Sequence, residues 1–503
     1  MAVKVSAVQQ SVIRQAASVA ANPRAIKTLF RALSALPVRG SVVRLADRAM
    51  WESLRRSDNL PGVARDEWLT LRSLLYSFHQ GLSNRTISPQ AWQRFVEFAA
   101  HALGAHPARE AFRGAYGQSP PGFLTISPTR SCNLSCTGCY AGTENDARTL
   151  SFAVLDRVVQ EMEDLWGARF AVISGGEPFL YQSEGNDLLN LAERHPKLYF
   201  LVYTNGTVID RPLAKRLAEA GNVTPAISVE GTAPTTERRR GDGTFTKVLE
   251  AFRHLRAEGV PFGISMTATR ENCEELLSDD VVGFYFEGQG ALYGWIFQYM
   301  PIGRGYDLSL MVTPEQRLRL QRRMWEVIRT KRIFLMDFWN SGTACHGCVA
   351  AGRAGGYFYI NWNGDVTPCV FIPYAGANIH EIYAAGGTIN DLMRVPFFAD
   401  IRQWQLSYGY RTKPQATQNL IRPCPHRDHF DFLLPLLDRH RPKPINQEAQ
   451  DALKNPTYVW GLLAYGAACA EVLDPIWLRE YRQLDEKGEA TVGREAVAQG
   501  ALG

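Results

Sequence analysis

The sequence predicts an α/β protein with a parallel β-sheet at its centre, a helical region before the sheet and a cysteine-rich domain after it. The first observation behind this prediction is that strand-like and helix-like segments alternate between residues 123 and 330, as they do in repeated βα units. The second is that residues 1–117 show helical spacing of apolar residues without strand-like alternation. The third is that seven of the nine cysteines form two groups, which is typical of metal binding in a reducing compartment. The predicted domains are 1–117, 123–330, 331–440 and 441–503.

The amino-terminal region is predicted to begin with a basic amphipathic helix. Residues 1–46 contain seven basic residues and no acidic one. Asn22-Pro23 suits a helix start, and apolar residues follow it at helical spacing: Ile26, Leu29, Phe30, Leu33 and Leu36. Such a helix either lies on an anionic membrane surface or packs on its own domain, and an organellar transit peptide has the same acid-poor composition. We expect a peripheral membrane contact through residues 1–46. The remaining residues are slightly acidic in sum, so we expect no nucleic-acid partner.

The central region is predicted to contain six βα units. The predicted strands are 123–128, 169–173, 198–204, 224–229, 261–268 and 295–300. The predicted helices are 151–166, 184–195, 210–221, 244–258 and 313–330, whereas the connection around 272–281 has no clear pattern. Because ligands of parallel α/β barrels bind at the carboxyl ends of the strands, the polar residues that follow these strands are the candidates for a site.

The first cysteine group directly follows the first predicted strand. Cys132, Cys136 and Cys139 have a CxxxCxxC spacing. Three thiolates hold three irons of a cubane [4Fe–4S] cluster and leave the fourth iron open to a small molecule. The alternative is a structural zinc site, but zinc prefers four ligands and this loop supplies three. The group therefore predicts an iron–sulfur site that binds a further ligand.

A glycine-rich turn after the second predicted strand supports this interpretation. The turn reads Ser174-Gly175-Gly176-Glu177-Pro178. Two glycines permit the close approach of a ligand to the backbone, and one carboxylate pairs with an ammonium group. Together with the cysteine motif, the turn resembles that of the radical S-adenosylmethionine (SAM) superfamily. The resemblance implies that the amino and carboxylate groups of SAM bind the open iron and that the turn holds the amino group.

The resemblance also implies a fold, a chemistry and a set of site residues. The fold is a partial (β/α)6, TIM-like barrel. The chemistry is reductive cleavage of SAM to a 5′-deoxyadenosyl radical, which abstracts hydrogen from an unactivated C–H bond; the electron comes from a partner such as flavodoxin or ferredoxin. No side chain is singled out as a general acid or base. The residues implied in SAM binding are Gly175, Gly176, Glu177, Pro178, Asn205, Ser228, Glu230 and Arg240.

One position departs from the family pattern. The family usually has an aromatic residue directly before the third cysteine, where it shields the cluster and contacts adenine. In this chain Gly138 stands there and Tyr140 follows the cysteine. Tyr140 is therefore our candidate for a contact with the cofactor.

The second cysteine group lies in the predicted domain 331–440. Its members are Cys345, Cys348, Cys369 and Cys424. Four thiolates match one closed [4Fe–4S] cluster, and a tetrahedral zinc ion is the alternative. The segment resembles the SPASM/twitch extension of radical SAM enzymes, which implies an auxiliary cluster. Nearby histidines are candidates to replace or support these ligands: His346, His426 and His429. Cys273 and Cys469 stand alone and are predicted to be core residues.

The substrate is predicted from the amino-terminal region. Many peptide-modifying relatives carry a leader-binding domain with three strands there, and no strand-like segment is found. With the basic helix, this favours a lipophilic, membrane-associated substrate. The alternatives are a peptide- or protein-modifying maturase and, as a non-enzyme, an iron–sulfur electron-transfer protein. No uninterrupted apolar run reaches the roughly 18–20 residues that span a bilayer, so we expect a cytoplasmic protein at the inner face of the membrane. A helix over Val459–Tyr481 and a disordered tail are predicted to end the chain.

Overall fold

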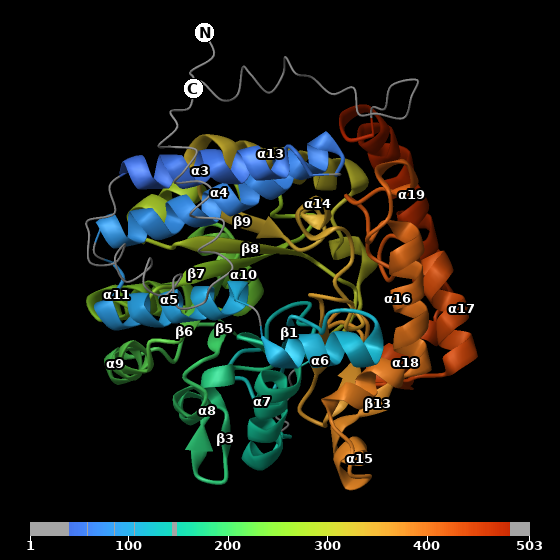
Figure 1. Cartoon of the computed structure of the whole chain (residues 1–503), viewed down its shortest axis with the longest axis horizontal. Helices are drawn as coiled ribbons and strands as arrows, with labels where there is room; N and C mark the ends of the chain where they lie inside the picture. Colours follow the sequence, from blue (N-terminus) through green and yellow to red (C-terminus); the bar gives the residue numbers. More distant parts are fainter. Residues whose placement is uncertain (1–39, 58, 85, 105, 143–147, 483–503) are drawn as a thin grey trace.

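The computed structural model describes residues 40–482 except 58, 85, 105 and 143–147 (Figure 1). The basic helix predicted before residue 40 and the tail predicted after residue 482 lie outside the described residues. Both stay predictions.

The described part of the amino-terminal region is helical, as predicted. It forms α3 (Gly40–Leu54), α4 (Pro61–Ser83), α5 (Pro89–Leu103) and α6 (Pro107–Tyr116). Proline occupies the first turn of α4, α5 and α6. Backbone N–H groups in the first turn have no hydrogen-bond acceptor within the helix, so the absence of an N–H in proline costs no helical hydrogen bond there. Helix α4 packs against α3 and against strand β9 (Phe334–Asp337), and α5 packs against α9 (Arg211–Ala220).

The main sheet has ten strands in the order β13-β11-β10-β1-β2-β5-β6-β7-β8-β9. The strands are β1 (Phe123–Ile126), β2 (Phe170–Ile173), β5 (Tyr199–Thr204), β6 (Val223–Val229), β7 (Gly263–Ala268), β8 (Tyr293–Gln298), β9 (Phe334–Asp337), β10 (Tyr357–Ile360), β11 (Asp365–Thr367) and β13 (Ala377–Asn378). All neighbouring strands from β10 to β9 pair in parallel. Strand β11 pairs antiparallel with β10 and with β13. The described strands β13 and β9 stand at opposite ends of this order, so the sheet is a partial barrel. The predicted fold class is confirmed.

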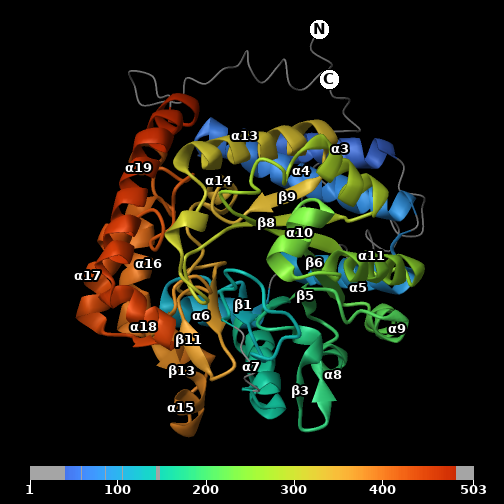
Figure 2. The same cartoon turned by 180° about the vertical axis from the view of Figure 1, so that it is seen from behind.

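Seven described helices cover the outside of the barrel; five lie close to predicted helices, whereas those over 233–240 and 279–282 were not predicted. They are α7 (Phe152–Trp166), α8 (Leu188–Arg194), α9 (Arg211–Ala220), α10 (Ala233–Arg240), α11 (Thr244–Ala257), α12 (Asp279–Val282) and α13 (Pro314–Lys331). Figure 2 shows the face on which α10 and α11 lie next to each other. Large apolar side chains such as Trp166 and Phe252 are fully buried in the core between sheet and helices.

Two connections of the barrel differ from the prediction. The segment predicted as a helix over 184–195 begins with a hairpin of β3 (Gln182–Ser183) and β4 (Asn186–Asp187). Glu184 and Gly185 both have positive φ there, which makes the tight turn. The connection without a clear pattern contains α12 and a π-helical segment, Gly283–Gly288.

The cysteine-rich region shares the barrel sheet instead of forming a separate layer. Strand β9 pairs with β8 at one end, and all four residues of β10 pair with β1 at the other. The sheet therefore crosses the predicted domain boundary near residue 330. The helices of this region and of the carboxyl terminus are α14 (Gly342–Cys345), α15 (Ile379–Ala384), α16 (Pro396–Tyr408), α17 (Phe430–His440), α18 (Gln447–Lys454) and α19 (Pro456–Glu480).

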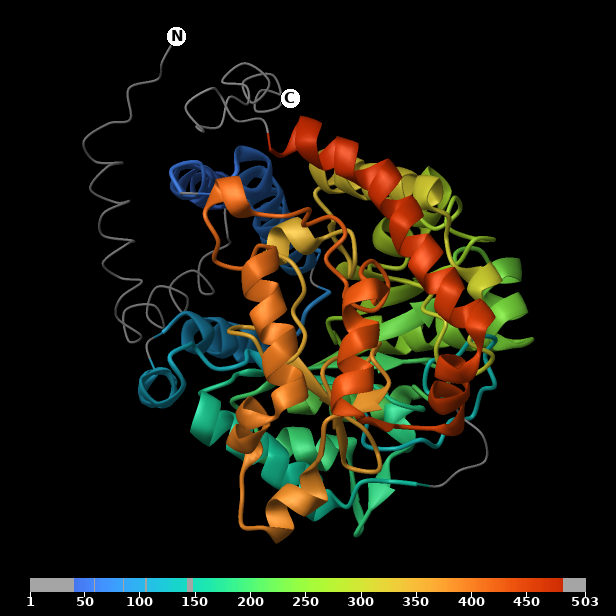
Figure 3. The same cartoon turned by 90° about the vertical axis from the view of Figure 1, so that its right-hand side faces the viewer.

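Helices α16, α17 and α19 stand side by side along one flank of the barrel (Figures 1 and 3). The helix predicted over Val459–Tyr481 is α19, which starts at the N-cap Asn455. By length and composition, α19 is the one described helix that is long and apolar enough to cross a membrane. Its outer side exposes Trp460, whose relative exposure is 71%.

Candidate active site

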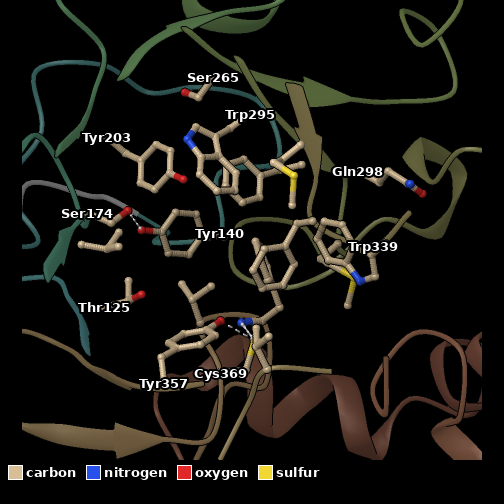
Figure 4. A pocket seen from close by; sticks show the side chains of 18 of the residues that line it. Thr125, Tyr140, Ser174, Tyr203, Ser265, Trp295, Gln298, Trp339, Tyr357 and Cys369 are labelled. Atoms are coloured by element: carbon tan, nitrogen blue, oxygen red, sulfur yellow. Dashed lines mark hydrogen bonds between the residues drawn. The ribbon is translucent and has the colours of Figure 1, made fainter. Parts of the chain in front are cut away.

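One cavity of about 670 Å³ lies at the carboxyl ends of the barrel strands and extends to the cysteine-rich region. Figure 4 shows part of its lining. All seven grouped cysteines line it: Cys132, Cys136, Cys139, Cys345, Cys348, Cys369 and Cys424. Cys273 and Cys469 are buried in apolar clusters instead, in the positions predicted for core residues. The two cysteine groups therefore face one shared space.

The loop with the first three cysteines rests on the glycine turn that follows β2. The N–H of Gly176 donates to the carbonyl oxygen of Thr129 at 2.9 Å, and the N–H of Glu177 donates to that of Ser131 at 2.7 Å. A Cβ on Gly176 would collide with the Ser131 carbonyl oxygen. Gly175 has a φ of 123°, a conformation that favours glycine. The packing of the turn against the cysteine loop therefore requires both glycines, and both also line the cavity.

The Glu177 carboxylate joins this turn to the end of β5. It accepts hydrogen bonds from the Thr204 hydroxyl at 2.7 Å, from the N–H of Asn205 at 2.8 Å and from the N–H of Phe179 at 3.1 Å. Burial raises the pKa of the carboxyl to about 7, although these hydrogen bonds oppose the shift. Glu177 and Pro178 lie behind the cavity lining. The implied pairing of Glu177 with an ammonium group stays a prediction, and the contacts of the carboxylate indicate a positioning role.

Asn205 and Ser228 are strand-end residues that do face the cavity. The Asn205 amide donates to Oδ1 of Asn133 at 2.8 Å and lies 3.8 Å from Sγ of Cys132. The Ser228 hydroxyl lies 3.3 Å from that of Ser265 on β7. The end of β5 thus contacts the first cysteine loop directly.

Two arginines at the end of α10 reach the cavity, and Glu230 holds both. Arg239 and Arg240 each donate to Oε1 of the fully buried Glu230, whose Oε2 accepts from the N–H of Thr267 at 2.9 Å. Burial lowers the pKa of Arg240, but the Glu230 carboxylate together with Cys136 and Cys139 raises it above its usual value. Glu230 does not line the cavity and therefore positions the arginines. Sequence reasoning singled out Arg240 and missed Arg239.

Tyr140 lies in the cavity wall beside the glycine turn (Figure 4). Its hydroxyl lies 2.6 Å from Oγ of Ser174 and accepts from the N–H of Gly175 at 3.1 Å. The space beside Gly138 is filled by Tyr299, because a Cβ on Gly138 would lie 2.5 Å from the Tyr299 ring. Tyr299 follows β8 and also lines the cavity. It explains why this chain has a glycine where the family usually has an aromatic residue.

Side chains of neighbouring residues hold the second cysteine group by hydrogen bonds to its main-chain atoms. The guanidinium of Arg353 donates to the carbonyl oxygens of Cys345 and Cys348. The N–H of Cys424 donates to Asp428 at 3.1 Å. Burial raises the pKa of the Cys424 thiol to about 12. Burial raises the pKa of the thiols of Cys345, Cys348 and Cys369 as well, and a thiol that binds a metal gives up its proton.

The donor set fits iron–sulfur clusters. Soft thiols are the ligands that such clusters use, and the lining of the cavity contains three cysteines of the first group and four of the second. Among the residues that the structure describes, no group of three His, Cys, Asp or Glu side chains is arranged to hold a single metal ion. The three nearby histidines have protein partners, namely Glu67 for His346, Phe371 and Tyr458 for His426, and Tyr408 and Arg422 for His429.

Aromatic side chains form much of the remaining wall, and sequence reasoning missed them. They include Phe170, Tyr203, Trp295, Phe297, Phe338 and Trp339. The alternating aromatic residues of β8 were the available signal, because alternate residues of a barrel strand point inward.

Asp337, at the end of β9, is the one carboxylate in the described lining. It accepts hydrogen bonds from the side-chain amides of Gln298 and Asn340, each at 2.8 Å. Burial raises its pKa despite these contacts. It was missed because the prediction ended the barrel before β9.

Comparison with known proteins agrees with this site. The model of the radical SAM superfamily matches residues 126–278. Fe-coproporphyrin III synthase of Methanosarcina barkeri is 32% identical over 158 residues, which are 29% of this chain and 37% of that protein. AdoMet-dependent heme synthase of the same organism is 25% identical over 288 residues, 52% of this chain and 80% of that protein. Sporulation killing factor maturation protein SkfB of Bacillus subtilis is 26% identical over 290 residues, 53% of this chain and 67% of that protein.

The residues matched by the superfamily model, 126–278, include the cysteine loop, the glycine turn and the strands β2, β5, β6 and β7. Residues 126–278 therefore match a radical SAM domain, and this superfamily implies a [4Fe–4S] cluster and SAM as cofactors.

Proposed function

We propose that this chain is a radical SAM enzyme that removes a hydrogen atom from an unactivated C–H bond of an apolar substrate held between its two cysteine groups. The observation that supports this most is the shared cavity, whose lining combines both cysteine groups with polar residues at strand ends and many aromatic side chains. When bound, the reduced cluster and SAM supply the hydrogen-abstracting radical, and the protein supplies binding, orientation and exclusion of water.

The residues of the barrel that line the cavity have separate roles in binding the cluster and SAM. Cys132, Cys136 and Cys139 hold the cluster, and the glycine turn that supports their loop gives SAM close access to the backbone. Arg239 and Arg240 place two positive charges at the cavity, which suits the SAM carboxylate. Asn205, Ser228 and Tyr140 offer polar atoms along the same lining.

The second cysteine group is proposed to hold an auxiliary [4Fe–4S] cluster. Its ligands are Cys345, Cys348, Cys369 and Cys424. All four thiols line the cavity, and four thiolates complete the coordination of one cubane. No open iron remains there, so we assign this site to electron exchange or to support of the substrate pocket, with flavodoxin or ferredoxin as the external electron donor for the enzyme.

The substrate is proposed to be a lipophilic small molecule. The aromatic wall favours it, because burial of apolar surface is the main attraction that such a wall offers. Two of the relatives are named as synthases of iron porphyrins, whose large flat macrocycle has apolar faces and carboxylate groups at its edge. A peptide is the second candidate, and the observation that favours it is the relation to a protein named for the maturation of sporulation killing factor.

Substrate-stimulated SAM cleavage distinguishes the two candidates. The anaerobically reconstituted enzyme is incubated with SAM and dithionite, together with either the organic-solvent extract or the peptide fraction of cells. We expect 5′-deoxyadenosine to form faster with the organic extract, and mass spectrometry to show loss of one of its compounds. Stimulation by the peptide fraction alone would contradict the lipophilic substrate and favour the second candidate.

We also propose that residues 1–46 bring the enzyme to the inner face of the membrane. Six of the seven basic residues precede residue 40, and each contributes on the order of 1 kcal/mol near an anionic surface. Residues 40–46 belong to α3, in which Val43 is buried, so deletion of residues 1–39 spares this packing.

Sedimentation with anionic liposomes tests this contact. We expect the full chain to bind at low ionic strength, to dissociate at high salt because the attraction is screened, and to lose binding when residues 1–39 are deleted. Binding that survives both the deletion and high salt would contradict the proposal and point to the exposed side of α19.

A further inference from the structure

Tyr357 contacts one ligand of the proposed auxiliary cluster. It is the first residue of β10, and its hydroxyl oxygen lies 2.9 Å from Sγ of Cys369 (Figure 4). The same sulfur accepts a hydrogen bond from the N–H of Phe371 at 3.4 Å. A metal-bound thiolate carries no proton, so the phenol is the donor when Cys369 binds iron.

The Tyr357 ring is held in place on both sides. It stacks on Phe123 with a centroid distance of 5.1 Å and an interplanar angle of 6°, and it meets Phe338 edge-on at 6.4 Å. Phe123 is also its direct partner in the β1–β10 register, and Tyr357 is fully buried. The hydroxyl therefore has a fixed direction, toward the Cys369 sulfur.

A hydrogen bond to a ligating sulfur stabilises the reduced cluster more than the oxidised one, because the reduced cluster carries one more negative charge. Hydrogen bonds to the sulfurs are among the features that set the reduction potentials of iron–sulfur clusters. Their effect is greater in a buried site, where water does not screen it. We propose that Tyr357 raises the reduction potential of the auxiliary cluster through its hydrogen bond to Cys369. This inference rests on the auxiliary cluster of the proposed function.

Tyr359 provides a matched control on the same strand. It points to the same face of β10 as Tyr357, since alternate residues of a strand share a face, and it is equally buried. Its hydroxyl donates to Oγ of Ser127 at 2.9 Å, and the cysteine in its electrostatic surroundings is Cys139 of the first group. Tyr359→Phe therefore removes a buried phenol hydroxyl from β10 without removing a hydrogen bond to a cluster ligand.

The test is a potentiometric titration followed by electron paramagnetic resonance. It uses the full chain with Cys132, Cys136 and Cys139 replaced by alanine, so that the signal comes from the auxiliary cluster. We expect Tyr357→Phe to keep about four irons per chain and to lower the ratio of reduced to oxidised cluster at a fixed potential by roughly tenfold. That ratio corresponds to a fall in midpoint potential of about 59 mV, whereas Tyr359→Phe should leave the midpoint unchanged.

Three results would overturn the inference. An unchanged midpoint in Tyr357→Phe shows that the hydroxyl does not tune the cluster, and an equal fall in Tyr359→Phe shows that the effect is a general one on the strand. Loss of iron from Tyr357→Phe alone assigns the phenol to assembly rather than to tuning. If the parent protein itself binds no second cluster, the proposed cofactor set fails as well, and the iron assay separates this outcome from the others.

Discussion

Replacing Cys132, Cys136 and Cys139 together by alanine is expected to abolish SAM cleavage and to leave about half of the iron. Two cubanes bind about eight irons per chain, and the variant keeps the four that Cys345, Cys348, Cys369 and Cys424 hold. SAM cleavage is lost because the open iron belongs to the first cluster. Iron and sulfide assays measure the first effect, and chromatographic quantification of 5′-deoxyadenosine measures the second.

Cys273→Ala is the control for this variant. Cys273 is a buried cysteine that packs in the apolar core away from the cavity, so its loss should change neither iron content nor SAM cleavage. A triple variant that binds no iron, or one that still cleaves SAM, would show that the two cysteine groups do not hold separate clusters.

Arg317→Ala is expected to lower the free energy of unfolding by about 3–5 kcal/mol, because it leaves the buried Asp428 carboxylate without its ionic partner. Arg317 lies on α13 with no exposed side-chain surface, and both of its terminal nitrogens contact Asp428. It also donates to Oδ1 of Asn340 at 3.1 Å and to the carbonyl oxygen of Ile421 at 2.8 Å. Urea titration of the metal-free protein, followed by tryptophan fluorescence, measures the loss.

Arg317→Ala is also expected to weaken iron binding by the second cysteine group. Asp428 accepts a hydrogen bond from the N–H of Cys424, so movement of Asp428 displaces a cluster ligand. Arg319→Ala, on the same helix, is the control: Arg319 and its partner Glu274 are each 56% exposed, and solvent-exposed pairs of this kind contribute little to stability. Equal losses of stability in the two variants would contradict a specific role for the buried pair.

The barrel was predictable because its strands and helices carry strong local patterns. All six predicted strands are present with ends within about two residues of the prediction. The hairpin of β3 and β4 was missed because its strands are two residues each and its sequence, Gln-Ser-Glu-Gly-Asn-Asp, is polar and has no strand-like alternation. The addition of β9 and β10 to the two ends of the sheet was missed for a different reason: it depends on pairing between residues far apart in the chain, and only tertiary packing selects it.

The candidate site was predictable where the chemistry lies in a motif. The cysteines were found from spacing alone, and all seven line one cavity. The roles of Glu177 and Glu230 were harder to predict, because a sequence shows that a carboxylate is present but not the direction in which it points. Both are turned into the protein, Glu177 toward the end of β5 and Glu230 toward Arg239 and Arg240. Tyr357 and Asp337 have no motif at all, and only the assembled sheet brings them to the cavity.

The most direct test of the central claim is anaerobic SAM cleavage by the wild-type chain with both clusters reconstituted. The account predicts that methionine and 5′-deoxyadenosine form in equal amounts when dithionite is present, and that neither forms without the reductant. Intact clusters that transfer electrons but yield no 5′-deoxyadenosine would contradict it, and the protein would then be an iron–sulfur electron carrier.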